Sequence, residues 1–261
     1  MNQVNLKATV PDALARCFQQ IPKAAIAFSG GVDSAYLLYA AKACGVVLRA
    51  YYVNAQFQPA FELADARRLG SELAVPLTVL PVDILKNERV RANPADRCYH
   101  CKSAILETIL SHAAADGYET VMEGSNASDD AGDRPGMRAL AELSVRSPLR
   151  MAGLTKKDVR HYAKEAGLFV WDKPSYACLA TRIPTDTPIT AEILEKIETA
   201  ETALADLGFT DFRARLWGDR VKLQFTADQM PLAAQRHEEI AALLTPLFSD
   251  ILLDLKPRSS T

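Results

Sequence analysis

The sequence predicts an α/β protein with an open, doubly wound parallel sheet, followed by a small C-terminal α+β domain. Three observations predict this fold class. Strand-like and helical segments alternate, a glycine loop joins the first strand to the first helix, and the pattern changes character after Pro184. Alternation of strand and helix is typical of a parallel sheet with helices on both faces. Ligands of such sheets bind beyond the carboxyl ends of the strands.

The N-terminal domain is predicted from β-branched and aromatic runs, which favour strands, and amphipathic runs, which favour helices. The expected order is a first strand from Lys23, a helix, a strand over 46–55, a helix over 61–75, a strand over 77–84, a helix over 102–115, and a strand ending at Gly124. We expect the loops that start at Ser29, Asn54 and Gly124 to face one crevice. Further along, Thr155 and Asp158 have the spacing of a helix-capping pair.

The C-terminal domain is predicted from the change near the prolines at 184 and 188. We place the boundary after Pro184, which gives domains of residues 1–184 and 185–261. The expected segments are a helix over 190–207, strands over 212–216 and 220–226, a helix over 231–247, and a last strand over 250–255.

Composition excludes several classes of protein. Of 261 residues, 49% are hydrophobic and 24% charged, as in folded globular proteins. A net charge of −2 lacks the overall positive charge that nucleic-acid-binding proteins normally have, and a local basic patch is the alternative that stays open. The N-terminus has no secretory pattern and no apolar run is long enough to cross a bilayer, so we expect a cytoplasmic protein with neither membrane nor nucleic acid as partner. Five cysteines are too few for a disulfide scaffold, which leaves chemistry, metal binding or burial.

A glycine loop between the first strand and helix has the composition of a phosphate site. Its residues are Ser29, Gly30, Gly31, Val32, Asp33 and Ser34. Two glycines let the backbone approach a phosphate, both serines can donate hydrogen bonds, and Asp33 can hold a divalent cation such as Mg²⁺. A simple Gly-Gly turn with a capping aspartate is the alternative interpretation. The Walker pattern is absent, which disfavours γ-phosphoryl transfer by a P-loop.

This hexamer resembles the PP-loop of ATP pyrophosphatases, which cleave ATP between the α- and β-phosphates and transfer AMP to a substrate oxygen. Longer stretches resemble the LarE family of ATP-dependent sulfur transferases, over about residues 20 to 255. They are RCYHCK (97–102), EGSNA (123–127), DRPG (133–136), RSPL (146–149), KPSYACLATRIP (173–184), and FRAR (212–215) with Gly218-Asp219.

The LarE resemblance implies a role in making the nickel-pincer nucleotide cofactor of lactate racemase. The implied enzyme adenylylates a carboxylate of pyridinium-3,5-biscarboxylic acid mononucleotide with Mg²⁺ and ATP, then replaces AMP with sulfur. A carboxylate is a poor electrophile until its oxygen leaves with AMP, so this order is chemically reasonable. The resemblance also implies a homo-oligomer, with a hexamer as the candidate, and other proteins of nickel-pincer biosynthesis as possible partners.

The resemblance assigns the sulfur to Cys178, which in single-cysteine members gives up its own sulfur and becomes dehydroalanine. Here Cys98 and Cys101 form a C-x-x-C just before the expected helix, which suggests the subgroup with three active-site cysteines. Three thiolates could hold a [4Fe–4S] cluster whose free iron carries an extra sulfide. Sacrifice of Cys178 without a cluster, a zinc site, a redox pair and plain thiols remain alternatives. Cys17 and Cys44 lie among apolar residues and are expected to be buried.

Polar residues near these motifs are candidate ligands. Asn126 is expected to reach the magnesium or the AMP ribose, and Asp129 and Asp130 either join it or form a solvated turn. Arg97 and Arg182 flank the cysteines and could bind a phosphate or the substrate carboxylate.

Alternate positions along a predicted strand put Arg213 and Arg215 on one face, where they could bind the phosphate of a mononucleotide, or form an exposed edge. Glu198 and Glu201 lie on one helix without an assigned role.

Three other functions compete with sulfur transfer to the pyridinium nucleotide. A tRNA thiolase would use the same loop and three cysteines but needs a basic RNA-binding face. An amide-forming PP-loop enzyme that uses ammonia would not need Cys178. A regulatory module would have lost its chemistry, which the complete loop of residues 29–34 disfavours.

Overall fold

The computed structural model describes residues 4, 8–129 and 135–259. Contacts divide the chain into a first unit (residues 1–55, 60–84 and 96–173) and a second unit (residues 56–59, 85–95 and 174–261). This grouping differs from the predicted division after Pro184. Hydrogen bonds to residues 174–184 explain the difference: the Leu179 N–H donates to the Phe57 carbonyl, and the Asn93 side chain donates to the Pro184 carbonyl.

The first unit contains the predicted parallel sheet, so the α/β fold class is confirmed. Its strands run in the order β3-β2-β1-β4, all parallel. The strands are β1 (Lys23–Ala27), β2 (Val47–Asn54), β3 (Leu77–Pro81) and β4 (Val121–Glu123). The chain order reverses direction at β1, so the neighbouring ends of β1 and β4 form the switch point where ligands of such sheets bind.

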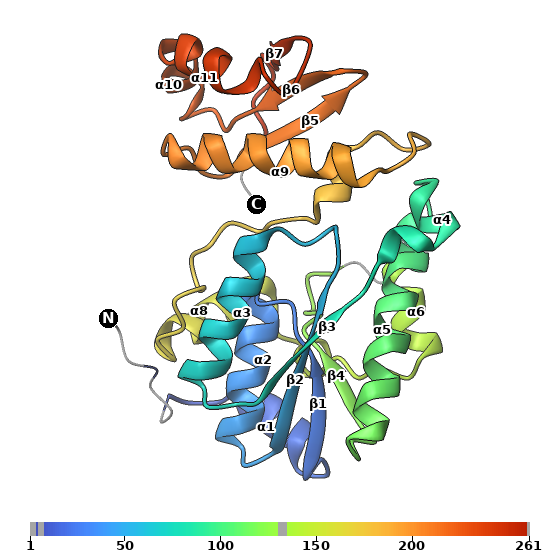
Figure 1. The fold of residues 1–261 in the computed structure, drawn as a ribbon. Helices are drawn as coiled ribbons and strands as arrows, with labels where there is room; N and C mark the ends of the chain where they lie inside the picture. The colour runs from blue at the N-terminus through green and yellow to red at the C-terminus, as the bar shows by residue number, and fades with distance from the viewer. Residues whose placement is uncertain (1–3, 5–7, 130–134, 260–261) are drawn as a thin grey trace. The chain divides into compact units, whose positions relative to one another are not determined.

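Helices cover both faces of this sheet (Figure 1). On one face lie α2 (Val32–Ala43), α3 (Ala60–Glu72) and α8 (Lys156–Glu165), and on the other lie α5 (Arg97–Ala115) and α6 (Pro135–Glu142). The unit also holds α1 (Asp12–Phe18) and α7 (Pro148–Met151). Helix α2 is buried on nearly every side from Ser34 to Ala41, in keeping with the apolar run from Ala35 to Ala41.

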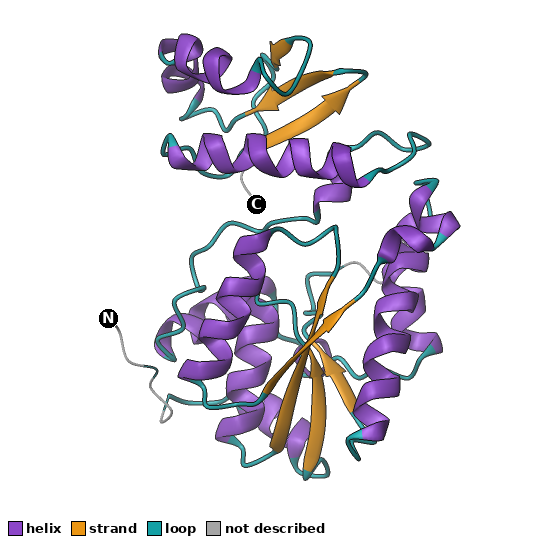
Figure 2. Ribbon diagram, viewed as in Figure 1, coloured by secondary structure: helices purple, strands orange, loops and turns teal. Residues whose placement is uncertain are grey.

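The second unit is the predicted small α+β module, with helices against a three-stranded sheet (Figure 2). Strands β5 (Arg213–Trp217) and β6 (Arg220–Gln224) form an antiparallel hairpin, and β7 (Ile251–Leu253) pairs with β6 in parallel. Its helices are α4 (Glu88–Arg91), η2 (Leu179–Arg182), α9 (Ala191–Asp206), α10 (Met230–Gln235) and α11 (His237–Leu244). A short turn, η1 (Ile84–Lys86), lies where the chain passes between the units.

Two predicted helix boundaries and two predicted burials are wrong. Helix α5 begins at Arg97, after Pro94 and the N-cap Asp96, so the C-x-x-C lies within its first turns and not before the helix. The predicted helix over 231–247 is two helices, because Arg236 leaves helical geometry at φ −97 and ψ 21. Cys44 is exposed at the end of α2, and Cys17 is only half-buried.

No helix in the described ranges combines the length and the apolar character needed to cross a membrane.

Candidate functional site

The glycine loop joins β1 to α2. Gly30 has φ +79, and a Cβ there would lie 3.0 Å from the Glu62 carbonyl oxygen, so glycine alone fits this position. The hydroxyl oxygens of Ser29 and Ser34 lie 3.0 Å apart, and the Gly31 N–H donates to Ser29 Oγ at 3.4 Å. Backbone amides and hydroxyls at a helix start form the kind of cradle that binds phosphate.

Asp33 links this loop to the end of β4. Asn126 Nδ2 donates to Asp33 Oδ1 at 3.2 Å, and Lys156 Nζ donates to Asp33 Oδ2 at 2.5 Å. Gly124 permits this approach, because a Cβ there would lie only 2.7 Å from the Ser34 backbone nitrogen. The loops after β1 and β4 therefore meet at one edge of the sheet, as the sequence predicts.

The turn after Asn126 is held by its own side chains. Asn126 Oδ1 accepts the Ser128 N–H at 2.9 Å, and Asp129 Oδ2 accepts the Asn126 N–H at 2.9 Å. Asp129 thus forms the predicted turn, and its role as a ligand stays a prediction. Asp130 lies outside the described residues.

Lys156 is a residue of this site that the sequence analysis did not identify. The capping box around it was predicted from the sequence and is confirmed. Asp158 Oδ2 accepts the Thr155 N–H at 2.9 Å, and Thr155 Oγ1 accepts the Asp158 N–H at 3.3 Å. Hydrogen bonds from Thr155 lower the pKa of Asp158. The box places Lys156 at the first helical position, but no local pattern indicates a contact with Asp33.

Glu123 ties the cysteine-bearing helix to the same edge of the sheet. This buried carboxylate accepts the Ser125 N–H at 3.0 Å and the Ser125 hydroxyl at 2.8 Å, and Ser147 also donates to it. Lys102, which follows the C-x-x-C, lies 3.7 Å from Glu123. This ion pair joins the first half of α5 to the end of β4.

The C-x-x-C presents two sulfurs on successive turns of α5. Cys98 is exposed and Cys101 half-buried. Arg97, itself buried, donates from Nη2 to Cys98 Sγ at 3.5 Å. Arg97 therefore contacts a sulfur here, and its binding to phosphate stays a prediction. Across the described part of the chain, no three His, Cys, Asp or Glu side chains gather closely enough to hold a metal ion.

The third cysteine belongs to the second unit. Cys178 is half-buried and directly precedes η2. Its carbonyl oxygen accepts the Thr181 N–H at 3.0 Å and the Thr181 hydroxyl at 2.8 Å. The backbone around this sulfur is therefore closed into a tight turn.

Three arginines donate to carbonyls of the cysteine segment, defined as residues 175–181. Arg182 donates to Ala177 O at 2.9 Å, Arg213 to Ser175 O at 2.8 Å, and Arg215 to Thr181 O at 2.7 Å. The prediction that Arg213 and Arg215 share one face of β5 agrees with these contacts. Burial, and then the charge of Arg182, lower the pKa of both arginines, although a guanidinium stays charged at any ordinary pH.

Several groups that pack around this segment donate hydrogen bonds to Glu201, whose role the sequence analysis left open. Its carboxylate accepts Arg182 Nε at 2.7 Å, Arg182 Nη2 at 3.0 Å and the Ala214 N–H at 2.9 Å. The Tyr176 hydroxyl also donates to it. Burial of Arg182 alone would lower its pKa, but the hydrogen bonds and charge of Glu201 raise it overall. The Arg182 donors are thus directed to protein groups, and its contact with a ligand stays a prediction.

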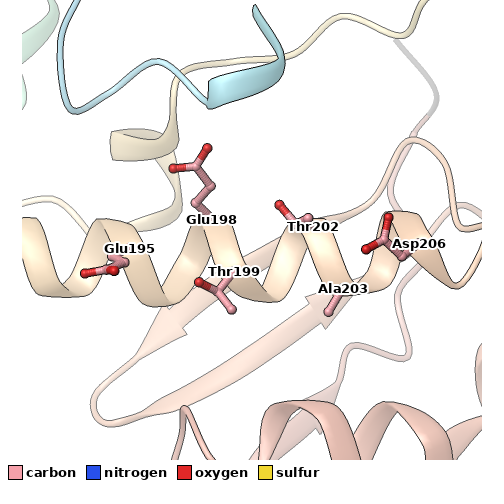
Figure 3. A pocket seen from close by; sticks show the side chains of 6 residues that line it. All are labelled: Glu195, Glu198, Thr199, Thr202, Ala203 and Asp206. Carbon is pink, nitrogen blue, oxygen red and sulfur yellow. The ribbon is translucent and has the colours of Figure 1, made fainter.

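Glu198, the second α9 glutamate that the sequence analysis left without a role, lines an open hollow of about 380 Å³ (Figure 3). The remaining lining residues are Glu195, Thr199, Thr202, Ala203 and Asp206. Three of these six residues carry a carboxylate, so the hollow would repel phosphate.

Known proteins resemble most of this chain, although no protein-family model matches it. The uncharacterized protein slr1717 of Synechocystis sp. is 33% identical over 220 residues, which are 83% of this chain and 81% of that protein. Pyridinium-3,5-bisthiocarboxylic acid mononucleotide synthase of Lactiplantibacillus plantarum is 29% identical over 83% of this chain and 79% of that protein. The uncharacterized protein MJ0830 of Methanocaldococcus jannaschii is 26% identical over 90% of each chain.

The parallel sheet, with its glycine loop between β1 and α2, defines a PP-loop α/β protein. The similarity extends over four-fifths of the chain and includes a named synthase. It therefore identifies a family within this class of fold. The chain belongs to the LarE family.

Proposed function

We propose that this chain is an ATP-dependent sulfur transferase that converts pyridinium-3,5-biscarboxylic acid mononucleotide to a thiocarboxylate. The observation that carries the proposal is the meeting of Asp33, Asn126 and the glycine loop at the switch point of the sheet. The name of the Lactiplantibacillus plantarum relative, a bisthiocarboxylic acid mononucleotide synthase, supports this choice of substrate.

In the first step the substrate carboxylate attacks the α-phosphorus of ATP, which forms an acyl adenylate and releases pyrophosphate. The loop of residues 29–34 would bind the phosphates through its backbone N–H groups and the hydroxyls of Ser29 and Ser34. Asp33 would hold Mg²⁺, for which its partly exposed carboxylate is suited. Asn126 would keep Asp33 in place through the bond to Oδ1.

In the second step sulfur attacks the acyl carbon, and AMP leaves with the C–O bond electrons. Cys178 would either supply this sulfur itself or, together with Cys98 and Cys101, hold a cluster that carries it. If Cys178 gives its own sulfur, a thioester forms first, and loss of the Cα proton then breaks the Cβ–S bond to leave dehydroalanine and the thiocarboxylate. Arg182, Arg213 and Arg215 fix the backbone that carries Cys178.

The chain also has the donor set for an iron–sulfur cluster. Cys98, Cys101 and Cys178 all lie outside disulfides, and thiolates are the ligands that such clusters require. When bound, a [4Fe–4S] cluster would supply an extra sulfide for transfer. Arg97, which donates to Cys98 Sγ, would help to hold the sulfur of that ligand in place.

The test is anaerobic incubation with ATP, Mg²⁺ and the substrate, followed by mass spectrometry of product and protein and by assay of iron and sulfide. We expect AMP, pyrophosphate and a product in which sulfur replaces oxygen. Asp33→Ala should abolish AMP formation without unfolding the protein, and Cys178→Ala should abolish sulfur transfer alone.

The exposed Cys44 provides the matched control, because Cys44→Ala removes a thiol far along α2 from the loop and should leave the reaction intact. Thiocarboxylate formation by Cys178→Ala would contradict the proposal. Loss of sulfur from Cys178 after turnover would select sacrifice over the cluster, as would the absence of iron and acid-labile sulfide.

A further inference from the structure

Arg258 follows β7 in the chain and is held beside the start of β5. Its backbone N–H donates to the Phe225 carbonyl at 2.9 Å, and its Nη1 donates to the Asp211 carbonyl at 2.7 Å. The same nitrogen forms an ion pair with the Asp211 carboxylate, and the two side chains are only 14% and 11% exposed. Water screens so buried a pair very little, so Arg258 and Asp211 are firmly joined.

Asp211 also lies close to Arg213, but its contact with Arg258 is nearer. Asp211 has φ +45, in the left-handed region that aspartate and asparagine tolerate better than most residues. Its Oδ1 is 3.7 Å from Arg213 Nη1, which is too far for a hydrogen bond. Arg213 instead donates to the Phe212 carbonyl at 2.6 Å and to the Ser175 carbonyl at 2.8 Å. Because Arg258 takes the carboxylate, Arg213 binds the cysteine segment.

Loss of Arg258 would change this arrangement. A guanidinium binds a carboxylate more strongly than it binds a carbonyl, because both partners are then charged. Without Arg258, the carboxylate of Asp211 would draw Arg213 away from the Ser175 carbonyl. The guanidinium of Arg213 also lies 5.4 Å from the centre of the Tyr176 ring, so its movement would remove a second contact with the same segment.

We propose that Arg258 is a positioning residue for Cys178: by pairing with Asp211, it keeps Arg213 on the Ser175 carbonyl and so holds the cysteine segment in place. The proposal rests on the proposed function and adds a residue that acts through Arg213. Its loss should therefore impair the second step, at the sulfur, and spare the first step, at the glycine loop.

Hydrogen exchange followed by mass spectrometry tests whether Arg258 holds the cysteine segment. Arg258→Gln should raise the exchange rate of the Leu179 and Thr181 N–H groups about tenfold, the factor that corresponds to losing one hydrogen bond from a charged donor. Exchange in α9 should stay unchanged, whereas a general loss of stability would raise it in both places. Lys256→Gln is the matched control, because it removes an exposed charge from the same stretch of chain and should leave exchange unaltered.

A double variant separates positioning from simple packing. Asp211→Asn removes the carboxylate that competes for Arg213, and asparagine tolerates the same positive φ. Arg258→Gln combined with Asp211→Asn should therefore bring the exchange rate back close to that of the unmodified protein. If thermal unfolding shows that Arg258→Gln does not fold, Arg258→Lys takes its place, with a smaller increase expected, because lysine keeps the charge.

The reaction itself gives the second measurement. With ATP, Mg²⁺ and the substrate, Arg258→Gln should release pyrophosphate at the rate of the unmodified protein. It should form less thiocarboxylate for each pyrophosphate released, because water hydrolyses an acyl adenylate that sulfur does not reach.

Three results would overturn the role of Arg258. They are unchanged exchange of the cysteine segment in Arg258→Gln, an equal increase in α9, and failure of the double variant to restore slow exchange. Equal losses of pyrophosphate and thiocarboxylate would likewise contradict it. If the unmodified protein releases no pyrophosphate, the proposed function fails, while hydrogen exchange still decides whether Arg258 holds the cysteine segment.

Discussion

The two units each contain a carboxylate paired with a cation, and the two pairs differ in burial and in the number of partners. Asp33 and Lys156 in the first unit are partly exposed, and each carboxylate oxygen has one side-chain donor. Arg182 and Glu201 in the second unit are 1% and 5% exposed, and Glu201 accepts four hydrogen bonds. The exposed pair can be rearranged by a ligand, whereas the buried pair holds the fold around Cys178.

Loss of Glu201 should have the largest effect on stability. Glu201→Ala leaves the guanidinium of Arg182 buried without its counter-ion, which costs about 3–5 kcal/mol. The free energy of unfolding in urea measures this loss. Glu195→Ala is the matched control on the exposed side of α9, with an expected change below about 0.5 kcal/mol. Equal stability of the two variants would show that the buried pair does not hold the unit together.

A methyl group at Gly124 should have the next largest effect, this time on the first unit. Gly124→Ala brings a Cβ within 2.7 Å of the Ser34 nitrogen, and such overpacking costs about 1–3 kcal/mol. Gly31→Ala is the stability control, because its Cβ would meet nothing closer than 3.5 Å. Urea unfolding of both variants measures the difference. If Gly124→Ala is as stable as Gly31→Ala, the close approach of β4 to α2 is not needed for the fold.

Removing the Tyr176 hydroxyl, one of the donors to Glu201, should have a smaller effect on stability. Tyr176→Phe deletes one of four donors and should lower the free energy of unfolding by roughly 1 kcal/mol. Burial, and then the charge of Glu201, raise the pKa of the Tyr176 phenol, so this bond should persist throughout the neutral and mildly alkaline range. Tyr99→Phe is the control, because its exposed hydroxyl donates to exposed Glu142. If Tyr176→Phe is as stable as the control variant, the hydrogen bond from Tyr176 to Glu201 does not stabilise the fold.

The capping box that positions Lys156 should give the smallest effect, and one that depends on pH. The pKa of Asp158 in the folded state is lower than its ordinary value because of hydrogen bonds from Thr155. The contribution of the box is therefore complete above the ordinary pKa, about 3.9, and is lost as the pH falls through the lower folded pKa. Asp158→Asn should cost about 0.5–1 kcal/mol at neutral pH. The difference in the free energy of unfolding between this variant and the unmodified protein should shrink as the pH falls below about 4. A difference that stays constant with pH would contradict this account.

Local patterns predicted the features that depend on neighbouring residues. The alternation of strands and helices, the loop of residues 29–34 and the Thr155–Asp158 capping box all follow from spacing along the chain. The same reasoning started α5 too late, at 102, because the polar residues 97–102 of its first turns do not show the apolar spacing that indicates a helix.

Partners distant in the chain could not be predicted in this way. Glu201 was one of several glutamates on an amphipathic helix, and nothing in its neighbourhood indicated Arg182 or Tyr176. Lys156 likewise resembled any lysine at a helix start until its contact with Asp33 was known.

The sequence by itself determined the class of fold, the phosphate-type loop and the LarE relationship, because each rests on a local motif or on residue order. Only the tertiary structure decided which carboxylate meets which cation and how deeply each pair is buried. Those choices depend on how helices and strands far apart in the chain pack together, and burial in turn decides whether an ion pair can open for a ligand or must remain closed for the fold.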